Sequence, residues 1–187
     1  MASPRAAAFF ACPGCGFARL LPIPPTAPPG GHDRYFHKAA SKRRRAARLM
    51  GWLSRAAGGG GGDYLDIGCH AGYMLEAAAE AGFRVSGVEP DGAALALAAR
   101  RVPAARLFAG RLGEVALPEA AFDLASAIEV IEHDPDPRAF AARLARALKP
   151  GALLYVTTPD WSHWRVPRDL ARWDGFDPPR HVCYFTP

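Results

Sequence analysis

The sequence contains no long apolar run, and acidic residues are scarce in its first third. No stretch approaches the roughly 18–20 consecutive apolar residues that a membrane-spanning helix needs, so we expect no such helix. In the opening stretch "MASPRAAAFFACP", Pro13 and the glycines after it interrupt a short apolar patch, and no secretory signal is expected. Residues 1–62 contain ten Lys and Arg against one acid, a charge of +9, whereas residues 63–187 contain thirteen against seventeen, a charge of −4. A basic arm therefore precedes a mildly acidic remainder.

Cysteine is also scarce, with four residues at irregular spacing: Cys12, Cys15, Cys69 and Cys183. This spacing does not match a disulfide framework, so a reducing, cytoplasmic setting is expected. Cys12 and Cys15 in "CPGCG" have the spacing of half a zinc knuckle, but a tetrahedral site needs two more ligands and no second cysteine pair follows. The pair is therefore either a remnant of a zinc site that no longer binds metal or, alternatively, part of a zinc site.

The composition divides the chain into three predicted segments. Residues 1–31 are rich in proline and glycine, so neither long helices nor central strands are expected there. Residues 32–62 form a basic helical arm that ends in a flexible linker of five glycines. Residues 63–187 alternate short apolar runs with helical patterns and form the main domain.

This alternation predicts a doubly wound α/β fold with a mainly parallel sheet of about five strands. Strands are expected at "YLDIG", "RVSGVEP", "ARLFAG", "FDLASAI" and "ALLYVTTP", and the last helix is expected at "DPRAFAARLARALKPG". Ligands of such sheets bind beyond the carboxyl ends of the strands. We therefore expect the functional residues directly after the strands.

The stretch "YLDIGCHAGYM" has the features of a ligand cradle between a strand and a helix. Gly68 and Gly72 permit a tight turn and close approach of a ligand, and amides of the first helical turn can donate to an anionic group. Glu89, at the tip of the next strand, follows Asp66 by 23 residues and can accept hydrogen bonds from both hydroxyls of a ribose. The pattern predicts a ribonucleoside cofactor.

Asp66 discriminates between two such cofactors. A dinucleotide-binding G-x-G-x-x-G loop faces a pyrophosphate and carries no acid, whereas here the third glycine is absent. The Asp66 carboxylate would repel a pyrophosphate but suits the ammonium group of an amino acid. The loop therefore favours a zwitterionic, sulfonium-bearing cofactor over a nicotinamide dinucleotide, and disfavours a dehydrogenase.

With "LDIGCHAGYML", "GVEPD", "FDLASAIEVIEHDPDP" and "LKPGALLYVTTP" in order, the chain resembles the class I S-adenosylmethionine-dependent methyltransferases. It is most similar to the branch with ubiquinone-biosynthesis O-methyltransferases and bacterial small-molecule methyltransferases. The resemblance implies a Rossmann-like fold, S-adenosyl-L-methionine as methyl donor and a small-molecule acceptor methylated at oxygen. The family's sheet has seven strands, and this chain stops at "CYFTP", where the last two would begin, so we expect a C-terminally truncated fragment without them.

The resemblance also implies which residues bind the cofactor. The methionine end would be held by Asp66, Gly68 and Gly72, and Cys69 and His70 of the same loop would also belong to the cofactor site. The ribose would be bound by Glu89, the adenine flanked by Pro90, Asp91, Gly110 and Arg111, and the site closed by Ile128 and Glu129. His70 departs from the family, which usually has a small residue there, and an imidazole pointing into the loop would crowd the cofactor's carboxylate.

The stretch "EVIEH" and the later "DPPRHVCYFTP" supply the candidate catalytic residues. His133 and His181 are candidate general bases for a hydroxyl acceptor. Alternatively, His133 caps a helix and His181 packs against Trp173 and Phe176. A divalent metal is a further alternative, as in the small-RNA 2′-O-methyltransferases that this pattern resembles, although most methyltransferases need none. Its candidate ligands are Glu129, Glu132, His133 and His181.

Three other features leave alternatives open. "SKRRRAAR" is a phosphate-binding or a merely solvated basic face, and the acidic remainder disfavours nucleic acid as the partner. Trp161, Trp164 and Trp173 line an apolar acceptor pocket or cover the sheet. A Cys69–His70 nucleophile pair is rejected, because adjacent residues in a tight loop point apart. A non-catalytic cofactor-binding fragment is the main rival of the enzyme.

Overall fold

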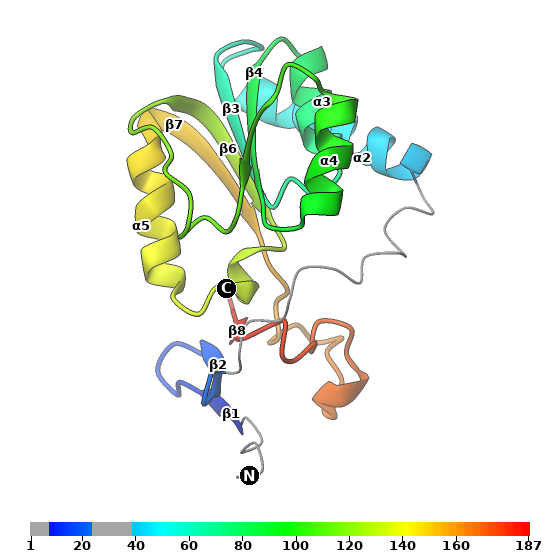
Figure 1. Cartoon of the computed structure of the whole chain (residues 1–187). Helices are drawn as coiled ribbons and strands as arrows, with labels where there is room; N and C mark the ends of the chain where they lie inside the picture. Colours follow the sequence, from blue (N-terminus) through cyan, green and yellow to red (C-terminus); the bar gives the residue numbers. More distant parts are fainter. Residues whose placement is uncertain (1–7, 24–38) are drawn as a thin grey trace. The chain divides into compact units, whose positions relative to one another are not determined.

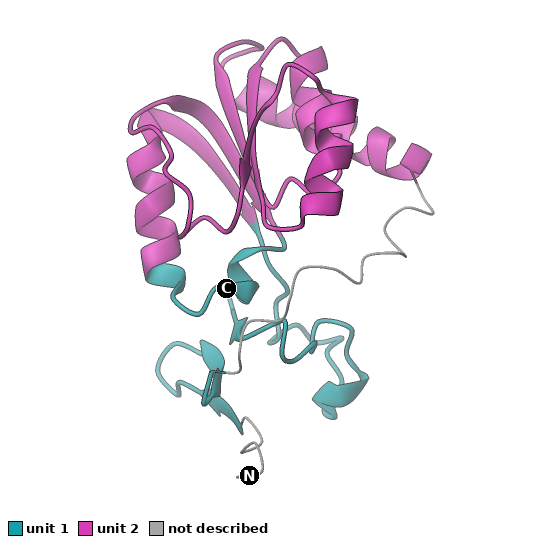
Figure 2. Cartoon of the chain, viewed as in Figure 1, with its two compact units in different colours: residues 1–28, 129–138, 157–187 teal, residues 29–128, 139–156 magenta. Residues whose placement is uncertain are grey.

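The computed structural model describes residues 8–23 and 39–187. Two compact units share the chain (Figure 2): one is built from residues 1–28, 129–138 and 157–187, and the other from residues 29–128 and 139–156. The structure thus groups an N-terminal stretch with the C-terminal one, a pairing that the three predicted segments do not contain. Among the described helices, none has the length and apolar character required to cross a membrane.

The larger unit is built on a five-stranded sheet with the order β5-β4-β3-β6-β7 (Figure 1). β3 pairs in parallel with β4 and β6, and β4 pairs in parallel with β5. The predicted Rossmann-like α/β fold of about five strands is confirmed. The strands are β3 (Asp63–Ile67), β4 (Arg84–Glu89), β5 (Arg106–Ala109), β6 (Phe122–Ile128) and β7 (Leu148–Thr157).

The last strand of this sheet begins earlier than the sequence predicts. β7 starts at Leu148, directly after the helix that ends at Ala147, and it includes Pro150 and Gly151, which were expected to follow the helix as a stop signal. β7 lies at the edge of the sheet, where proline is tolerated because an edge strand has a partner strand on one side only.

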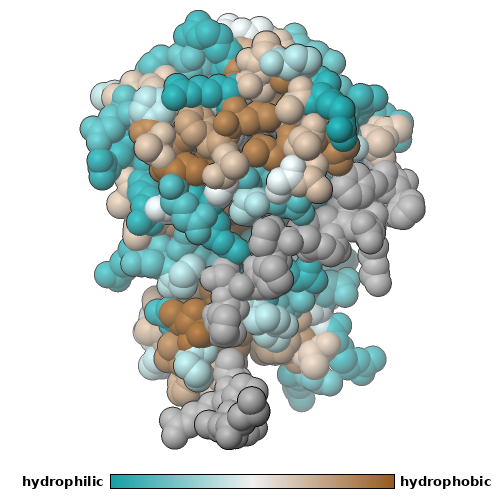
Figure 3. Space-filling model, viewed as in Figure 1, coloured by the Kyte–Doolittle hydropathy of each residue, from teal (hydrophilic) through white to brown (hydrophobic). Residues whose placement is uncertain are grey.

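Helices flank both sides of the sheet. In Figure 1, α5 lies to the left of the strands, whereas α2, α3 and α4 lie to the right. Ala46, Met50 and Leu53 recur at helical spacing on the buried face of α2 and pack into a core with Leu75 and Leu124. Elsewhere, the face of this unit in Figure 3 shows an apolar area bordered by hydrophilic residues. The helices are α2 (Ala39–Ala56), α3 (Tyr73–Glu80), α4 (Gly92–Arg101) and α5 (Pro137–Ala147).

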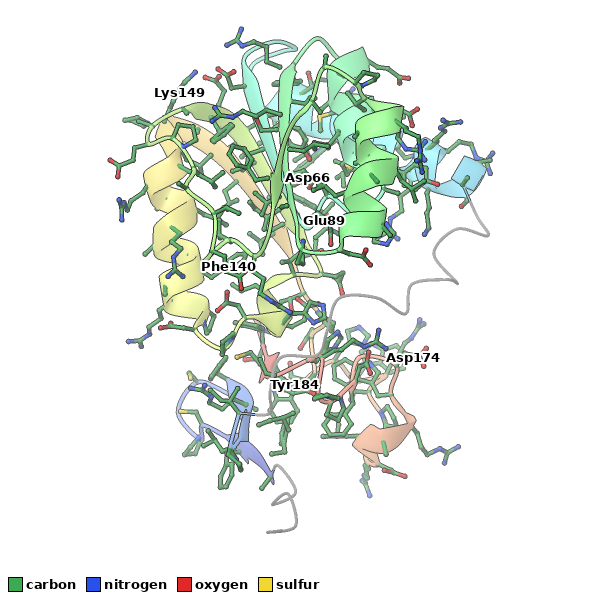
Figure 4. All side chains as sticks on the ribbon, in the orientation of Figure 1. Asp66, Glu89, Phe140, Lys149, Asp174 and Tyr184 are labelled. Atoms are coloured by element: carbon green, nitrogen blue, oxygen red, sulfur yellow. The ribbon has the colours of Figure 1, made fainter. Side chains whose placement is uncertain are left out.

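Charged groups join the strands at the end of the sheet opposite to the predicted site. Arg84 donates to the Asp63 carboxylate at 2.6 and 2.8 Å, and Lys149 donates to Asp123 at 2.7 Å. The Asp63 amide also donates to the Asp123 carboxylate at 2.8 Å. Lys149 and Glu89 lie at opposite ends of the sheet in Figure 4. This network is therefore structural and leaves the carboxyl ends of the strands for a ligand.

The smaller unit contains an antiparallel sheet with the order β1-β2-β8, formed by β1 (Ala8–Ala11), β2 (Ala18–Leu21) and β8 (Cys183–Tyr184). The expectation of no central strand in residues 1–31 is wrong for β2, which has partners on both sides. Its four residues, ARLL, lack proline and glycine, so both edges can form backbone hydrogen bonds. Two short 3-10 helices complete this unit, η1 (Ile131–His133) and η2 (Leu170–Arg172).

Candidate functional site

The parallel strands of the larger unit bring the predicted cofactor residues to one edge of the sheet. Asp66 on β3 is in register with Gly87 on β4 and with Ser126 on β6, so the loops after these strands begin at the same level. Asp66 and Glu89 lie beside each other in Figure 4. This edge carries Asp66, Gly68, Cys69, His70 and Gly72 after β3, Glu89, Pro90 and Asp91 at the end of β4, Gly110 and Arg111 after β5, and Ile128 at the end of β6.

Asp66 is buried at the end of a chain of hydroxyl groups. The Ser126 hydroxyl donates to its carboxylate at 2.6 Å, so the Tyr64 hydroxyl, 2.5 Å from Ser126, must donate to Ser126. Burial raises the pKa of Asp66 to about 7, although the hydrogen bond from Ser126 and the nearby Tyr64 hydroxyl oppose the rise. A cationic group beside this carboxylate would favour its charged form. Sequence reasoning missed Ser126 and Tyr64, because their roles depend on the register between strands.

Glu89 fastens two of the loops to each other. Its buried carboxylate accepts the backbone amide of His70 at 2.8 Å and that of Asp91 at 2.9 Å. The amide of Gly110 in turn donates to the Glu89 carbonyl at 3.1 Å. Each carboxylate oxygen has a second lone pair that can accept a hydroxyl of a ligand. The residue predicted to bind a ribose is therefore held in place before a ligand arrives.

The loop between β3 and α3 is a tight turn. Gly68 and Cys69 both donate their amides to the Val88 carbonyl, at 2.8 and 3.1 Å. His70 has a φ of 45° and Gly72 a φ of 78°, in the left-handed region that glycine tolerates best. Gly72 is the N-cap of α3 and has no side chain to cap it, which leaves amides of the first turn as donors for an anionic group. Burial raises the pKa of the Cys69 thiol, which disfavours a thiolate nucleophile.

In the smaller unit, three predicted residues form a cluster of metal-ligating side chains. Glu132, His133 and His181 offer ligand atoms that all lie within 4.8 Å of one another. The two imidazole rings meet edge to face with their centroids 4.8 Å apart. Glu129, the fourth candidate ligand, is not a member of this group, although its charge lies near Glu132. The structure therefore brings together three of the four candidates.

Backbone carbonyls set the tautomers of both histidines. Nδ1 of His133 lies 2.9 Å from the Arg180 carbonyl oxygen, and Nδ1 of His181 lies 2.7 Å from that of Gly175. A carbonyl oxygen can only accept, so each Nδ1 carries the hydrogen and each neutral ring has its lone pair on Nε2. Histidines that bind metals or act as bases are commonly oriented in this way.

Glu132 is the most buried member of the cluster, with 1% of its surface exposed. Neither carboxylate oxygen makes a hydrogen bond of good geometry within the described residues. Burial raises the pKa of Glu132 to about 7, and the Glu129 charge adds to the rise, while the adjacent Thr158 hydroxyl opposes it. A buried carboxylate without a well-aligned donor, next to two imidazole rings, fits the ligand set of a divalent cation.

The three tryptophans and the Cys12–Cys15 pair do not form a recognisable binding site in the part of the chain that the structure describes. Trp161 and Trp173 pack against Tyr184 in the core of the smaller unit, whereas Trp164 is 79% exposed. Two of the three tryptophans therefore cover the small sheet. Cys12 and Cys15 are exposed free thiols, and no third Cys, His, Asp or Glu of the described ranges joins them in a group that could hold a metal.

Curated proteins that are similar in sequence to this chain are named as methyltransferases. The chain is 31% identical over 135 residues to the ubiquinone biosynthesis O-methyltransferase of Rhodopseudomonas palustris strain BisA53, a match that covers 63% of this chain and 53% of the relative. It is 36% identical over 106 residues to the enzyme of the same name from Idiomarina loihiensis, covering 50% and 41%. The chain spans about half of the length of these and other curated relatives that it matches, or less.

The structural comparison agrees on the fold. A crystal structure assigned as an S-adenosyl-L-methionine-dependent methyltransferase, from Methanococcus maripaludis, superposes with a TM-score of 0.61 at 15% identity, covering 67% of this chain and 61% of that one. Residues 40–187 match the family described as "Methyltransferase domain". These matches confirm the resemblance that the sequence motifs indicated, and S-adenosyl-L-methionine is the methyl donor that they support. The chain belongs to the methyltransferase-domain family, among the class I S-adenosylmethionine-dependent methyltransferases.

Proposed function

We propose that the protein transfers a methyl group from S-adenosyl-L-methionine to an oxygen atom of a small-molecule acceptor. The acceptor oxygen attacks the sulfonium methyl group in line, the new O–CH3 bond forms as the S–CH3 bond breaks, and S-adenosylhomocysteine leaves. The proton of the acceptor hydroxyl passes to an imidazole Nε2. Alignment and exclusion of water supply most of the rate increase in such a displacement.

The cofactor half of this proposal rests on the larger unit. Asp66 is a buried acid that lacks a cationic partner within the described residues, so it suits the ammonium group of the cofactor. Glu89 has its oxygens held by two amides and would accept the ribose hydroxyls. We assign the amides at the start of α3 to the cofactor's carboxylate.

The observation that favours an oxygen acceptor is the paired histidines. His133 and His181 both have Nδ1–H bound to a carbonyl, so each neutral ring has its lone pair on Nε2, and both residues belong to the cluster with the buried Glu132. Such a base contributes roughly 10²–10⁴-fold to a proton transfer. These three residues would also hold a divalent cation, which supplies a lowered pKa for a hydroxyl bound to it. The similarity to ubiquinone biosynthesis O-methyltransferases supports the same acceptor atom.

Calorimetry and methyl transfer test the proposal in two steps. S-adenosylhomocysteine should bind, NAD should not, and Asp66→Ala and Glu89→Ala should each weaken S-adenosylhomocysteine binding. Tritium from the S-adenosyl-L-methionine methyl group should then appear on catechols or phenols from an acceptor panel, and His133→Ala or His181→Ala should abolish it. Binding of NAD alone would contradict the cofactor. Binding of S-adenosylhomocysteine with no transfer to any acceptor would favour a non-catalytic cofactor-binding fragment.

One observation favours a second candidate, 2′-O-methylation of RNA. α2 carries six basic residues and no acid, which is a composition typical of phosphate-binding helices. Arg43 forms an ion pair with Glu76 at 2.9 Å, so the other basic side chains of α2 would contact the RNA phosphates. An RNA oligonucleotide with a free 2′-hydroxyl at its 3′ end belongs in the acceptor panel. Label on the RNA and none on phenols would replace the first candidate by the second.

A further inference from the structure

The three clustered side chains of the smaller unit come from two segments that are distant in sequence. Glu132 and His133 belong to η1, whereas His181 precedes β8. The segments meet through three hydrogen bonds: from the Val182 amide to the Glu132 carbonyl at 2.9 Å, from His133 Nδ1 to the Arg180 carbonyl at 2.9 Å, and from the Cys183 thiol to the Asp134 carbonyl at 3.4 Å. The geometry of the cluster therefore depends on how firmly the segment around β8 is held.

β8 contains two residues, too few to persist without a partner strand. Within the described chain its strand partner is β2, in the register Ala18 to Tyr184 and Arg19 to Cys183. The Leu20 amide adds a hydrogen bond to the Val182 carbonyl at 3.0 Å. Val182 thus accepts from the N-terminal hairpin and donates to Glu132. Through Val182, the β1–β2 hairpin is therefore connected to η1, which carries Glu132.

Arg19 extends this connection from β2 to the loop after η1. Its Nη2 donates to the Pro135 carbonyl at 3.1 Å, two residues after His133. Its Nε is buried without a hydrogen-bond partner in the described parts of the chain. A buried N–H donor without an acceptor is costly, so the contact of this half-buried side chain with the loop is not explained by stability alone. The same side chain lies close enough to Cys183 for its charge to affect that thiol.

We propose that the β1–β2 hairpin is a positioning element for the Glu132, His133 and His181 cluster, and that Arg19 is its positioning residue. Arg19 holds the loop after η1 while β2 holds β8, so the hairpin fixes both segments relative to each other. A displacement on the order of 1 Å at a reacting group can cost about 100-fold in rate. This inference rests on the proposed function insofar as the cluster binds a metal or acts as the base.

Arg19→Met tests the inference, because it removes the donors and keeps an apolar stem of similar length. Arg168→Met is the matched control, since Arg168 is an exposed arginine of the same unit. The probe is Co²⁺, titrated into the full chain and followed by its visible absorption. We expect Arg19→Met to weaken Co²⁺ binding at least tenfold, Arg168→Met to leave it unchanged, and Arg19→Lys to recover part of the loss. S-adenosylhomocysteine affinity should stay within twofold in all three variants.

A second measurement separates this inference from the proposed function. Long-range ¹H–¹⁵N spectra of the imidazoles report the tautomer of each ring without any metal or acceptor. Wild type should show Nδ1–H at His133 and His181, and Arg19→Met should lose this preference at His133. If wild type binds no Co²⁺, the metal part of the proposed function fails while the tautomers still test the hairpin. Unchanged tautomers in Arg19→Met, with unchanged Co²⁺ affinity where Co²⁺ binds, would overturn the inference.

Discussion

His70 donates its backbone N–H to the Glu89 carboxylate over 2.8 Å, and this hydrogen bond joins the loop after β3 to the end of β4. The second carboxylate oxygen accepts the Asp91 amide at 2.9 Å. One buried side chain thus holds two loops of the proposed cofactor site. Loops that are ordered beforehand lose less entropy when a ligand binds, which favours affinity.

Glu89→Gln should weaken S-adenosylhomocysteine binding by about tenfold or more. The amide NH2 group cannot accept a hydrogen bond, so one of the two buried backbone amides loses its partner at a cost of about 1–3 kcal/mol. Calorimetric titration measures the change. Glu80→Gln, at the exposed end of α3, is the control and should bind like wild type. Equal affinities for the two variants would show that Glu89 does not organise the site.

Glycine should be better tolerated than alanine at position 70. Both substitutions remove the imidazole, but the φ of 45° costs a residue with a Cβ roughly 1–2 kcal/mol more than glycine. We therefore expect His70→Gly to exceed His70→Ala in unfolding free energy by about 1 kcal/mol in urea titrations. The neighbouring Ala71, whose φ is not positive, provides the control, because Ala71→Gly should lower stability. The opposite order at position 70 would contradict the left-handed loop conformation.

The ligand-free protein should lose stability as the pH rises from about 4 to about 7. Burial raises the pKa of Asp66 to about 7, whereas an aspartate in an unfolded chain titrates near 3.9, so the folded state binds more protons between these values. Stability that is present below about pH 4 is lost as the pH approaches the folded-state pKa. Glu132, whose pKa burial also raises to about 7, acts with the same sign.

Urea midpoints measured across this pH range check the sign. Asp66→Asn should flatten the decline, and adding Glu132→Gln should remove most of what remains. A midpoint that rises between these pH values in wild type would mean that both carboxyls are charged and paired in the folded state. S-adenosyl-L-methionine should reduce the decline as well, because its ammonium group stabilises the ionised form of Asp66.

The sequence predicts the larger unit well because its fold is encoded locally. Each strand is a short apolar run, each helix has its own periodicity, and the carboxyl ends of parallel strands necessarily share one edge. Asp66 and Glu89 could therefore be placed together before any coordinates were known. The partners of Asp66 could not, since Ser126 reaches it only through the register of β3 against β6.

The smaller unit could not be predicted from local sequence patterns, because its sheet is formed by strands that are distant in sequence. β2 contains four residues and β8 two, and neither has a pattern that specifies the other as its partner. The turn between β1 and β2 contains proline and glycine, which locally predict a loop. The joining of His133 to His181 was expected from a family resemblance, and residue periodicity gave no sign of it.

Glu132→Gln should make the metal-free protein more stable at about pH 8 while removing its affinity for Co²⁺. Above a pKa of about 7 the buried carboxylate is charged without a good hydrogen-bond donor, so a neutral side chain of the same shape relieves a cost on the order of 1 kcal/mol. The substitution also removes the anionic ligand that a divalent cation needs. Calorimetric unfolding in the presence of a chelator measures the first effect, and Co²⁺ absorption measures the second. Glu129→Gln is the matched control, because Glu129 lies three residues away and outside the cluster, and it should change both quantities less. Lower stability of Glu132→Gln in chelator would mean that the carboxylate already has a stabilising partner, and the case for a cation at Glu132, His133 and His181 would then fail.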